Sequence, residues 1–332
     1  MNISFKKLLF VLSVTITACQ PREKLPDVSG LQQAVEIVPF EELFNKNLQP
    51  FKDSVSTLKE KVIGFDCYYN YVMGFGRDLN MGATMYYKFR NDTNILKLYD
   101  TVKQHYPTMK RYESELSQAF AYHRYYLPTF IVPSVYTCIS EFGPAASTCD
   151  TSIFVSLDMY LHSSYPYYSN FEFPLYMQQR FREEYITPNA IKAWVKNIVP
   201  DSMGRRLLDL MVAEGKVLYI TKKLLPTTAD TLIQPFTAQQ LSWLNDNEGS
   251  CWSFFIEQNL LYLTAFMETR KYVTDAPTTP GMPRESPGNV GSWLGYKIVK
   301  QFMDNSPEVT LTQLLYLVDG QTMLAQAKYK PK

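Results

Sequence analysis

Apolar residues recur at intervals of three and four residues along most of the chain. This spacing places them on one face of a helix, and clusters of proline, glycine and polar residues end each such stretch. Asp92 and Thr93 can cap one of these helices, and Pro107 separates it from the next. The pattern predicts helices over 40–48, 55–63, 92–105, 108–126, 175–184, 189–198, 205–225, 238–245, 251–263, 289–303, 311–318 and 321–328.

The hydrophobic pattern changes at Pro128. Residues 129–140 and 152–158 are rich in valine, isoleucine, phenylalanine and threonine, which favour strands, and a Gly-Pro turn lies between them. These segments predict a small antiparallel sheet around residues 129–158. Because helices precede and follow it, the predicted fold class is α+β, mainly α-helical. Residues 274–288 are rich in proline and glycine and predict a loop.

The N-terminal residues predict a lipoprotein signal. Lys6 and Lys7 precede the apolar run 8–14, and small residues lead into Cys19, whose thiol can take a diacylglycerol. The apolar run is too short to span a membrane. An ordinary signal peptide with an accidental cysteine is the alternative. The predicted organisation is a signal peptide over 1–18, a lipidated N-terminus and linker over 19–39, and a single globular domain over 40–332.

Charge and composition exclude one class of partner. The formal net charge is +1 for the whole chain, and it becomes −1 once the two lysines of the signal are removed. No basic field is left to hold nucleic acid, so we expect no nucleic-acid partner. Aromatic residues make up 14% of the chain and are scattered along it, which favours a role in the core over a carbohydrate- or peptide-binding surface.

Four cysteines remain beside Cys19. An oxidising compartment permits up to two disulfides among them, with three full pairings. Cys138 and Cys149 flank the predicted turn, so we expect them to face each other across a hairpin and to form a disulfide. Cys67 and Cys251 are either a second pair or two buried thiols.

Common catalytic motifs are absent from the sequence. The chain has three histidines, His105, His123 and His162, and no two of them have the His-x-x-x-His spacing of a zinc hydrolase helix. There is also no Gly-x-Ser-x-Gly nucleophile motif and no phosphate-binding loop. We therefore expect no catalytic residue, metal or cofactor.

Two segments are unusual for a helical domain. Glu214 and Gly215 lie inside the apolar helix 205–225, where glycine costs about 1 kcal/mol relative to alanine. We expect a lysine or arginine to satisfy Glu214 and another element to cross at Gly215. In the second segment, Gly291 and Gly295 lie one turn apart, so we expect a close neighbour there, with Glu214 and Gly215 as the candidates.

At these segments the chain resembles the gliding motility lipoprotein B family of the Bacteroidota. The resemblance covers nearly the whole mature chain and rests on the order and spacing of many short motifs. These are Asp92-Thr93, residues 126–130, 155–161, Arg180-Phe181, Tyr185-Ile186, Glu214-Gly215-Lys216 with Tyr219, residues 241–243, Asn247-Glu248, residues 286–288, 291–295 and 328–331. The resemblance implies a role in gliding motility and in type IX protein secretion.

The same segments resemble, more remotely, predicted zinc metallopeptidases of the gluzincin type. In those proteins a His-Glu-x-x-His helix precedes a helix bearing Glu-Gly, whose glutamate is the third metal ligand. Glu214-Gly215 matches the second helix, but residues 190–197, where the first motif belongs, contain no ligand. The resemblance therefore implies a peptidase-like domain that has lost its metal. Its degenerate site would include Glu214, Gly215, Lys216, Tyr219, Arg284, Gly291 and Gly295.

The expected function is a periplasm-facing lipoprotein that serves gliding and type IX secretion as a non-catalytic scaffold or assembly factor. Its partners would be the membrane, through the lipid on Cys19, and other gliding or secretion proteins; either membrane could hold it. One alternative is a hydrolase of peptides or glycans that pairs Glu214 with Glu184 or Glu248. The other is a surface lipoprotein that binds peptide or sugar, although residues 20–24 lack the acidic run that resembles surface-export signals.

Overall fold

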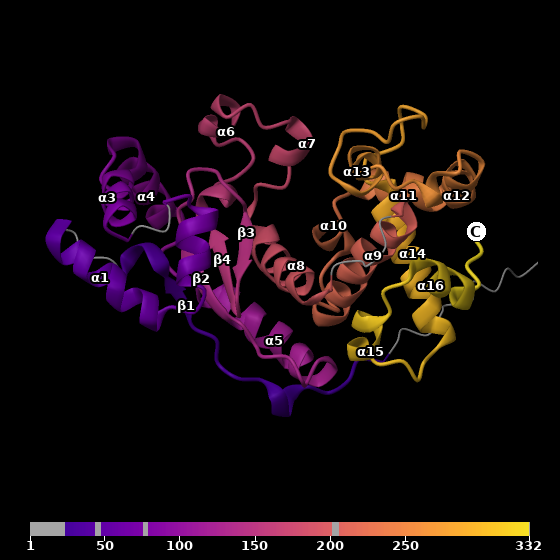
Figure 1. The fold of residues 1–332 in the computed structure, drawn as a ribbon, viewed down its shortest axis with the longest axis horizontal. Helices are drawn as coiled ribbons and strands as arrows, with labels where there is room; N and C mark the ends of the chain where they lie inside the picture. The colour runs from indigo at the N-terminus through magenta and orange to yellow at the C-terminus, as the bar shows by residue number, and fades with distance from the viewer. Residues whose placement is uncertain (1–23, 44–47, 76–78, 201–205, 332) are drawn as a thin grey trace, which may run out of the picture.

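The computed structural model describes residues 24–43, 48–75, 79–200 and 206–331. The predicted signal peptide, residues 1–18, and the predicted lipidation site, Cys19, lie outside these residues. Helices make up most of the fold and surround one small sheet (Figure 1). No helix among the described residues combines the length and the apolar character that a membrane span requires.

The helices with eight or more residues are α1 (Leu48–Lys61), α3 (Leu79–Arg90), α4 (Thr93–His105), α5 (Lys110–Tyr126), α8 (Ile186–Ile198), α9 (Leu207–Leu224), α11 (Ala238–Asp246), α12 (Glu248–Glu257), α13 (Phe266–Val273), α14 (Val290–Asn305) and α16 (Gly320–Ala327). Shorter helical segments are η1 (Ser29–Leu31), η2 (Phe40–Glu42), α2 (Phe65–Cys67), η3 (Tyr68–Val72), η4 (Leu157–Tyr160), α6 (Pro166–Asn170), α7 (Leu175–Gln178), η5 (Glu183–Tyr185), α10 (Asp230–Ile233), η6 (Leu260–Tyr262) and α15 (Leu311–Tyr316).

The mainly helical prediction is confirmed, apart from one predicted helix that tertiary packing interrupts. Asp92 accepts hydrogen bonds from the backbone of residues 94 and 95 and starts α4 as expected. The predicted helix 175–184 is wrong: it divides into α7 and η5. The chain turns between them so that Phe181 packs against Tyr168, with ring centroids 4.8 Å apart. Tertiary packing thus outweighs local helix propensity here.

The sheet is mixed rather than antiparallel. Its order is β1 (Ile37–Pro39), β2 (Ser134–Cys138), β4 (Ser152–Ser156), β3 (Ala146–Cys149). β1 and β4 both run parallel to β2, so the predicted antiparallel pairing of the two long segments is wrong. The turn after Gly143 leads into β3, and a second reversal at Asp150, whose φ is 52°, starts the antiparallel strand β4. These two reversals leave β2 and β4 parallel.

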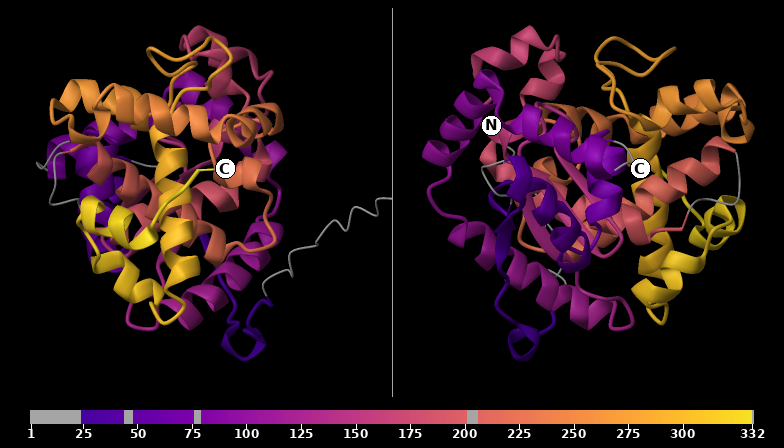
Figure 2. Two further views of the ribbon diagram at one scale, coloured as in Figure 1. Left: turned by 90° about the vertical axis from the view of Figure 1, so that its right-hand side faces the viewer. Right: turned by 60° about the vertical axis from the view of Figure 1, so that its left-hand side comes forward.

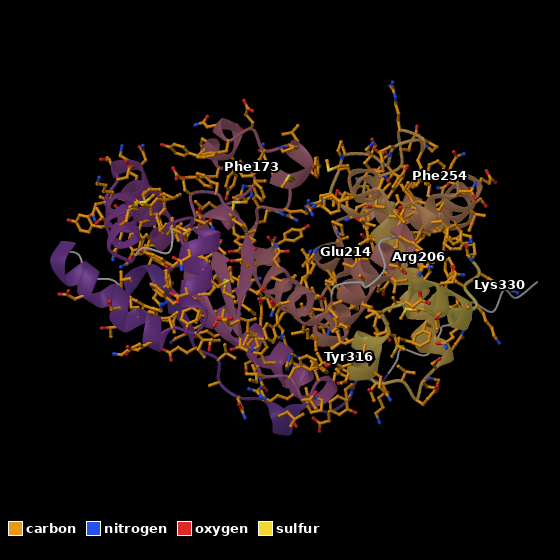
Figure 3. The ribbon with its side chains drawn as sticks, viewed as in Figure 1. Phe173, Arg206, Glu214, Phe254, Tyr316 and Lys330 are labelled. Atoms are coloured by element: carbon orange, nitrogen blue, oxygen red, sulfur yellow. A yellow bond between two sulfur atoms is a disulfide. The ribbon has the colours of Figure 1, made fainter. Side chains whose placement is uncertain are left out.

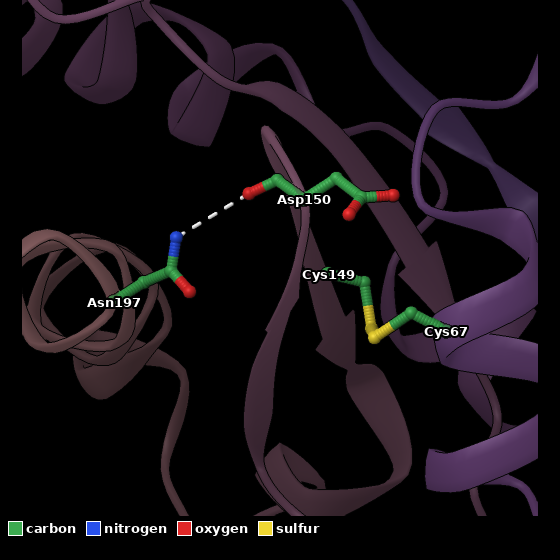
Figure 4. Close-up of a disulfide and its surroundings, with 4 residues drawn as sticks. All are labelled: Cys67, Cys149, Asp150 and Asn197. Carbon is green, nitrogen blue, oxygen red and sulfur yellow. Dashed lines mark hydrogen bonds between the residues drawn. A yellow bond between two sulfur atoms is a disulfide. The ribbon is translucent and has the colours of Figure 1, made fainter.

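This topology also changes the disulfide. Cys149 is bonded to Cys67, with Cα atoms 5.5 Å apart (Figure 4). Cys138 is a buried free thiol. The predicted Cys138–Cys149 pair is wrong because Cys138 lies opposite Ser156 while Cys149 lies opposite Ser152. Four residues along a strand separate those positions by about 13 Å, too far for a disulfide. Cys251 is a second buried free thiol.

The two faces of the sheet bury different side chains. Val135, Ile153 and Val155 point into the larger core, which also contains residues of α5, α8, α9 and α14. Their neighbours Tyr136 and Phe154 point to the opposite face and join a smaller core with residues of α1, α2, η3 and α3. In Figure 1 the N-terminal helices and α5 with α8 accordingly lie on opposite sides of the strands.

Aromatic rings fill the smaller core. Phe154 stacks on Tyr68 with centroids 4.0 Å apart, and Phe40 meets Phe154 edge to face at 5.6 Å. Most of the largest fully buried side chains of the described structure are aromatic. The expected core role of the aromatic residues is therefore confirmed for these rings.

The segment before the sheet lies against the domain. Ser117 in α5 donates a hydrogen bond to the carbonyl oxygen of Gln33 at 2.5 Å, and Arg124 donates to that of Leu31 at 3.2 Å. In both views of Figure 2 this segment lies at the lower edge of the molecule. Residues 31–33 are thus held on the surface of α5, and strand β1 starts before residue 40, where the sequence predicted a linker.

Candidate functional site

Helices α9 and α14 cross at two glycines. A methyl group added to Gly295 would overlap the carbonyl oxygen of Met211, and one added to Gly215 would overlap the backbone of Gly295. Gly215 and Gly295 therefore let the two backbones touch, as expected from their place in apolar helices. Gly291 has a different neighbour: a methyl group there would lie 2.6 Å from the carbonyl oxygen of Tyr272 in α13.

Glu214 points away from this crossing. Its Oε1 accepts a hydrogen bond from Nζ of Lys196 in α8 at 2.7 Å, and its side chain is 30% exposed. Figure 3 shows Glu214 in the middle of the molecule. The carboxylate is thus satisfied by a lysine from the neighbouring helix.

Lys216 lies neither at the glycine crossing nor beside Glu214. Its side chain is buried, and Nζ donates hydrogen bonds to the carbonyl oxygens of Leu315 and Leu317 at the end of α15. Burial lowers the pKa of Lys216 to about 8, because water no longer solvates the charge. Tyr219 is also buried, and its ring lies 6.4 Å from that of Tyr296 in α14.

Arg284 is separate from the other predicted site residues. It is exposed in the 274–288 loop and lines neither of the two cavities described below. The same loop is anchored at Gly288, where a methyl group would overlap the backbone of Ala276. Of the predicted set, only Glu214 lines either of these two cavities, while Gly215, Gly295, Lys216 and Tyr219 are buried.

A cavity of about 540 Å³ lies beside Glu214, and we call it the α8–α9 groove. Residues from α8 and α9 line one part of it, and residues from the chain before β3, from α7 and from the loop after α13 line the rest. They include Gly143, Ala145, Ala146, Phe173, Met177, Arg180, Asn189, Lys192, Lys196, Glu214, Leu218, Gln234, Asp275 and Asn289. A second cavity of about 440 Å³ lies next to it, since Arg180, Tyr185, Pro235, Asp275 and Asn289 line both.

Two ion pairs cross the groove. Lys196 joins α8 to Glu214 in α9, and Arg180 after α7 joins Asp275 after α13, with Nη2 and Oδ2 2.7 Å apart. The second pair links the two segments that project upward in Figure 1, because α7 belongs to one and α13 to the other. Each pair consists of one cation and one carboxylate, so neither pair adds net charge to the groove.

Lys192 is the third cation of the groove. Its Nζ donates a hydrogen bond to the carbonyl oxygen of Ile233 at 3.3 Å, and no carboxylate of the described chain forms an ion pair with it. Burial lowers its pKa to about 8, and Arg180 and Lys196 add to this while Asp275 and Glu214 oppose it. The groove thus has an excess of one positive charge.

Sequence reasoning missed Lys192, Arg180 and Asp275 as parts of the site. A signal for Lys192 exists: together with Lys196 it places two charges one turn apart on a helix whose other faces are apolar. The Arg180–Asp275 pair joins residues 95 positions apart, and no local pattern predicts such a contact.

The carboxylate pairs considered from sequence do not form. Glu184 lines a different cavity, beside Thr187 and Leu224. Glu248 is buried, accepts a hydrogen bond from Tyr329 at 2.8 Å and pairs with Lys297 at 3.1 Å. The described residues also contain no group of three or more His, Cys, Asp or Glu side chains placed to hold a metal ion.

Comparison with known proteins places the chain in a family. Searches of the curated proteins and of the solved structures find no match. The family described as gliding motility protein GldB matches residues 21–331, which is almost the whole chain. The chain therefore belongs to the GldB family of gliding motility lipoproteins.

Proposed function

We propose that the protein is a periplasm-facing lipoprotein, anchored through Cys19, that serves gliding motility and the associated type IX secretion as a non-catalytic scaffold or assembly factor. Membership of the GldB family supports the motility role. The Lys-Lys n-region, short apolar run and small residues before Cys19 support the lipid anchor.

One observation supports a non-catalytic role above all others: the ion pair between Lys196 and Glu214. In a peptidase-like arrangement, the face of α8 beside Glu214 would present two metal-binding imidazoles one turn apart. Here that face presents Lys192 and Lys196, which are one turn apart and line the groove. An ammonium group has no lone pair to give a metal ion, and it repels one. The groove is therefore suited to binding a partner and not to hydrolysis by a metal ion.

The path of the N-terminal segment supports an orientation on the membrane. Only the peptide links from Cys19 to Lys24 separate the lipid from the first described residue, a span of about 18 Å at most. Residues 24–36 then follow α5, so the α5 side of the domain lies near the bilayer. The segments that border the groove project from the opposite side (Figure 1), and the groove would open toward the periplasm.

The test of the non-catalytic role is Glu214→Gln in cells that lack the native protein. We expect gliding and secretion to continue at the native rate, because the amide still accepts a hydrogen bond from Lys196. A hydrolase that uses Glu214 as acid or base would lose orders of magnitude of its rate. Loss of gliding by a variant that accumulates to the native level would contradict the proposal.

The anchor is tested separately with Cys19→Ser. We expect this variant to lose labelling by a radioactive fatty acid and to move to the soluble fraction. Alanine at Ser13, an h-region position, is the matched control and should leave labelling intact. Continued acyl labelling of Cys19→Ser would contradict the predicted anchor.

A further inference from the structure

Strand β3 is an edge of the sheet and borders the groove. It pairs with β4 on one side and ends the strand order on the other. The backbone N–H of Ser156 donates to the carbonyl oxygen of Ala145. Because hydrogen-bonded pairs alternate in an antiparallel ladder, Ala146 and Thr148 direct their N–H and C=O groups away from β4. Ala145 and Ala146 also line the groove, and residues 145–148 are half-buried.

Two buried amide oxygens of the groove have no partner within the described chain. Gln234 is 5% exposed and Asn289 is 9% exposed, and each has an amide oxygen without a hydrogen bond. Both side chains line the groove. A buried acceptor without a donor is destabilising, so a donor from an ordered water or from a bound ligand would stabilise each amide. Backbone N–H groups of a polypeptide are donors of this kind.

The charges of the groove select for an acidic group. Glu214 and Asp275 are each paired with a cation, whereas Lys192 donates, within the described part of the chain, only to a carbonyl oxygen. A carboxylate placed at Lys192 would neutralise the excess charge and restore the favourable environment that burial removes from the ammonium group. Apolar side chains of Phe173, Met177 and Phe181 line the same groove and can receive apolar side chains.

From these three observations we infer that the groove binds an extended polypeptide segment, which adds to β3 as a further strand and places a carboxylate on Lys192. Strand addition supplies partners for the free groups of Ala146 and Thr148. The carboxylate belongs to an Asp or Glu side chain or to a chain terminus. This inference deepens the proposed scaffold role, on which it rests, by naming the chemistry of the bound partner.

The experiment uses the mature lipidated chain in detergent micelles and three pools of short fluorescein-labelled peptides rich in valine and threonine. The first pool has a central Glu and an amidated end, the second a central Gln and a free carboxylate end, and the third a central Gln and an amidated end. Binding is measured by fluorescence anisotropy, with empty micelles subtracted. We expect saturable binding of the first or second pool, which identifies the carboxylate, and binding of the third at least about tenfold weaker.

Variants test the role of Lys192. Lys192→Met should weaken the binding of the preferred pool about tenfold, and Lys192→Arg should retain most of it, since both cations pair with a carboxylate. Lys300→Met is the matched control, because Lys300 is exposed on α14 and pairs with Asp304, away from the residues that line the groove. Equal binding by Lys192→Met and the control would overturn the assignment of the carboxylate to Lys192.

Hydrogen exchange tests the strand addition. The amides of Ala146 and Thr148 should become protected when the preferred pool binds, while those of Ser147 and Cys149, which face β4, change little. Binding without protection at Ala146 and Thr148 would overturn strand addition, and no binding by any pool would overturn the whole inference. Neither result touches the scaffold role, which fails only if Glu214→Gln abolishes gliding.

Discussion

Two adjacent residues of α9 lie in contrasting regions of the molecule. One is at the tight crossing of α9 with α14, and the other is in the groove between α8 and α9. At the crossing, Gly215 has no side chain and α14 lies against its backbone. One residue earlier, Glu214 reaches into the groove and pairs with Lys196. The crossing leaves no space for a single methyl group, whereas the groove holds a cavity and an unmatched positive charge. Glu214 and Gly215 look equally out of place in an apolar helix, but they serve different purposes. Gly215 lets two helices pack closely, and Glu214 lines a groove that is suited to binding.

The largest effect is expected for Gly295→Ala. The added methyl group overlaps the carbonyl oxygen of Met211, which is helix backbone and cannot rotate aside, so α9 and α14 must separate. We expect a loss of about 3 kcal/mol or more in the free energy of unfolding, measured by urea denaturation. Gly30→Ala is the control, since no atom of the described residues lies within 4 Å of the added methyl group there. Equal stability of the two variants would contradict the close crossing.

Lys216 provides a pH-dependent test of the buried side of α9. Its pKa is about 8 in the folded chain, below the ordinary value of 10.5, so the unfolded chain binds more protons between those values. The stability of the native protein should therefore rise by about 3 kcal/mol relative to Lys216→Met as pH increases from 8 to 10.5. Urea denaturation at several pH values in this window measures the difference. If the stabilities of the two proteins changed in parallel with pH, the pKa of Lys216 would not be lowered by burial in the folded chain.

Gly291→Leu should have an intermediate effect. Its neighbour is the backbone of Tyr272 together with the side chain of Val273 in the short helix α13, which can shift more easily than α9. We expect a loss of about 1 to 3 kcal/mol and a lower melting temperature in calorimetry. An unchanged melting temperature would place Gly291 against solvent. Normal gliding by a variant that melts lower would show that the contact is structural only.

Glu214→Gln should change stability least. The carboxylate is 30% exposed and its partner Lys196 is 65% exposed, and ion pairs of this kind contribute about 0 to 1 kcal/mol. We expect the melting temperature to stay within a few degrees of the native value. A loss comparable to that of Gly295→Ala would mean that Glu214 supports the core, and the contrast with Gly215 would fail.

The sequence predicts local features of this fold better than distant ones. Helix α4 follows from its aspartate cap and its apolar spacing, and the tight contact at Gly295 follows from the low helix propensity of glycine. The parallel pairing of β2 with β4 was not predicted, because the extra strand β3 contains only four residues and carries polar Ser147 and Thr148. The Cys67–Cys149 bond was missed for the same reason, since it depends on the position of β3.

The groove shows the same division. The sequence identified Glu214 as a charge in an apolar helix and predicted a lysine or arginine as its partner. It did not identify that partner as Lys196. Lys192 went unnoticed because a lysine on a helix surface is ordinary. The approach of residues 143–146, 173–181, 232–235 and 273–275 turns that surface into a cavity. These segments approach one another through contacts between residues far apart in the chain, which the local hydrophobic pattern does not predict.

The role of the α8–α9 groove is tested most directly by the gliding of cells that carry Lys192→Met in place of the native protein. Lys192→Arg, Glu214→Gln and Lys300→Met serve as controls, and immunoblots of membrane fractions show that each variant accumulates. We expect Lys192→Met to accumulate at the native level and its cells to glide poorly or not at all, while cells with each of the three controls glide normally. Normal gliding by Lys192→Met would contradict the claim that the α8–α9 groove is the working site of the protein.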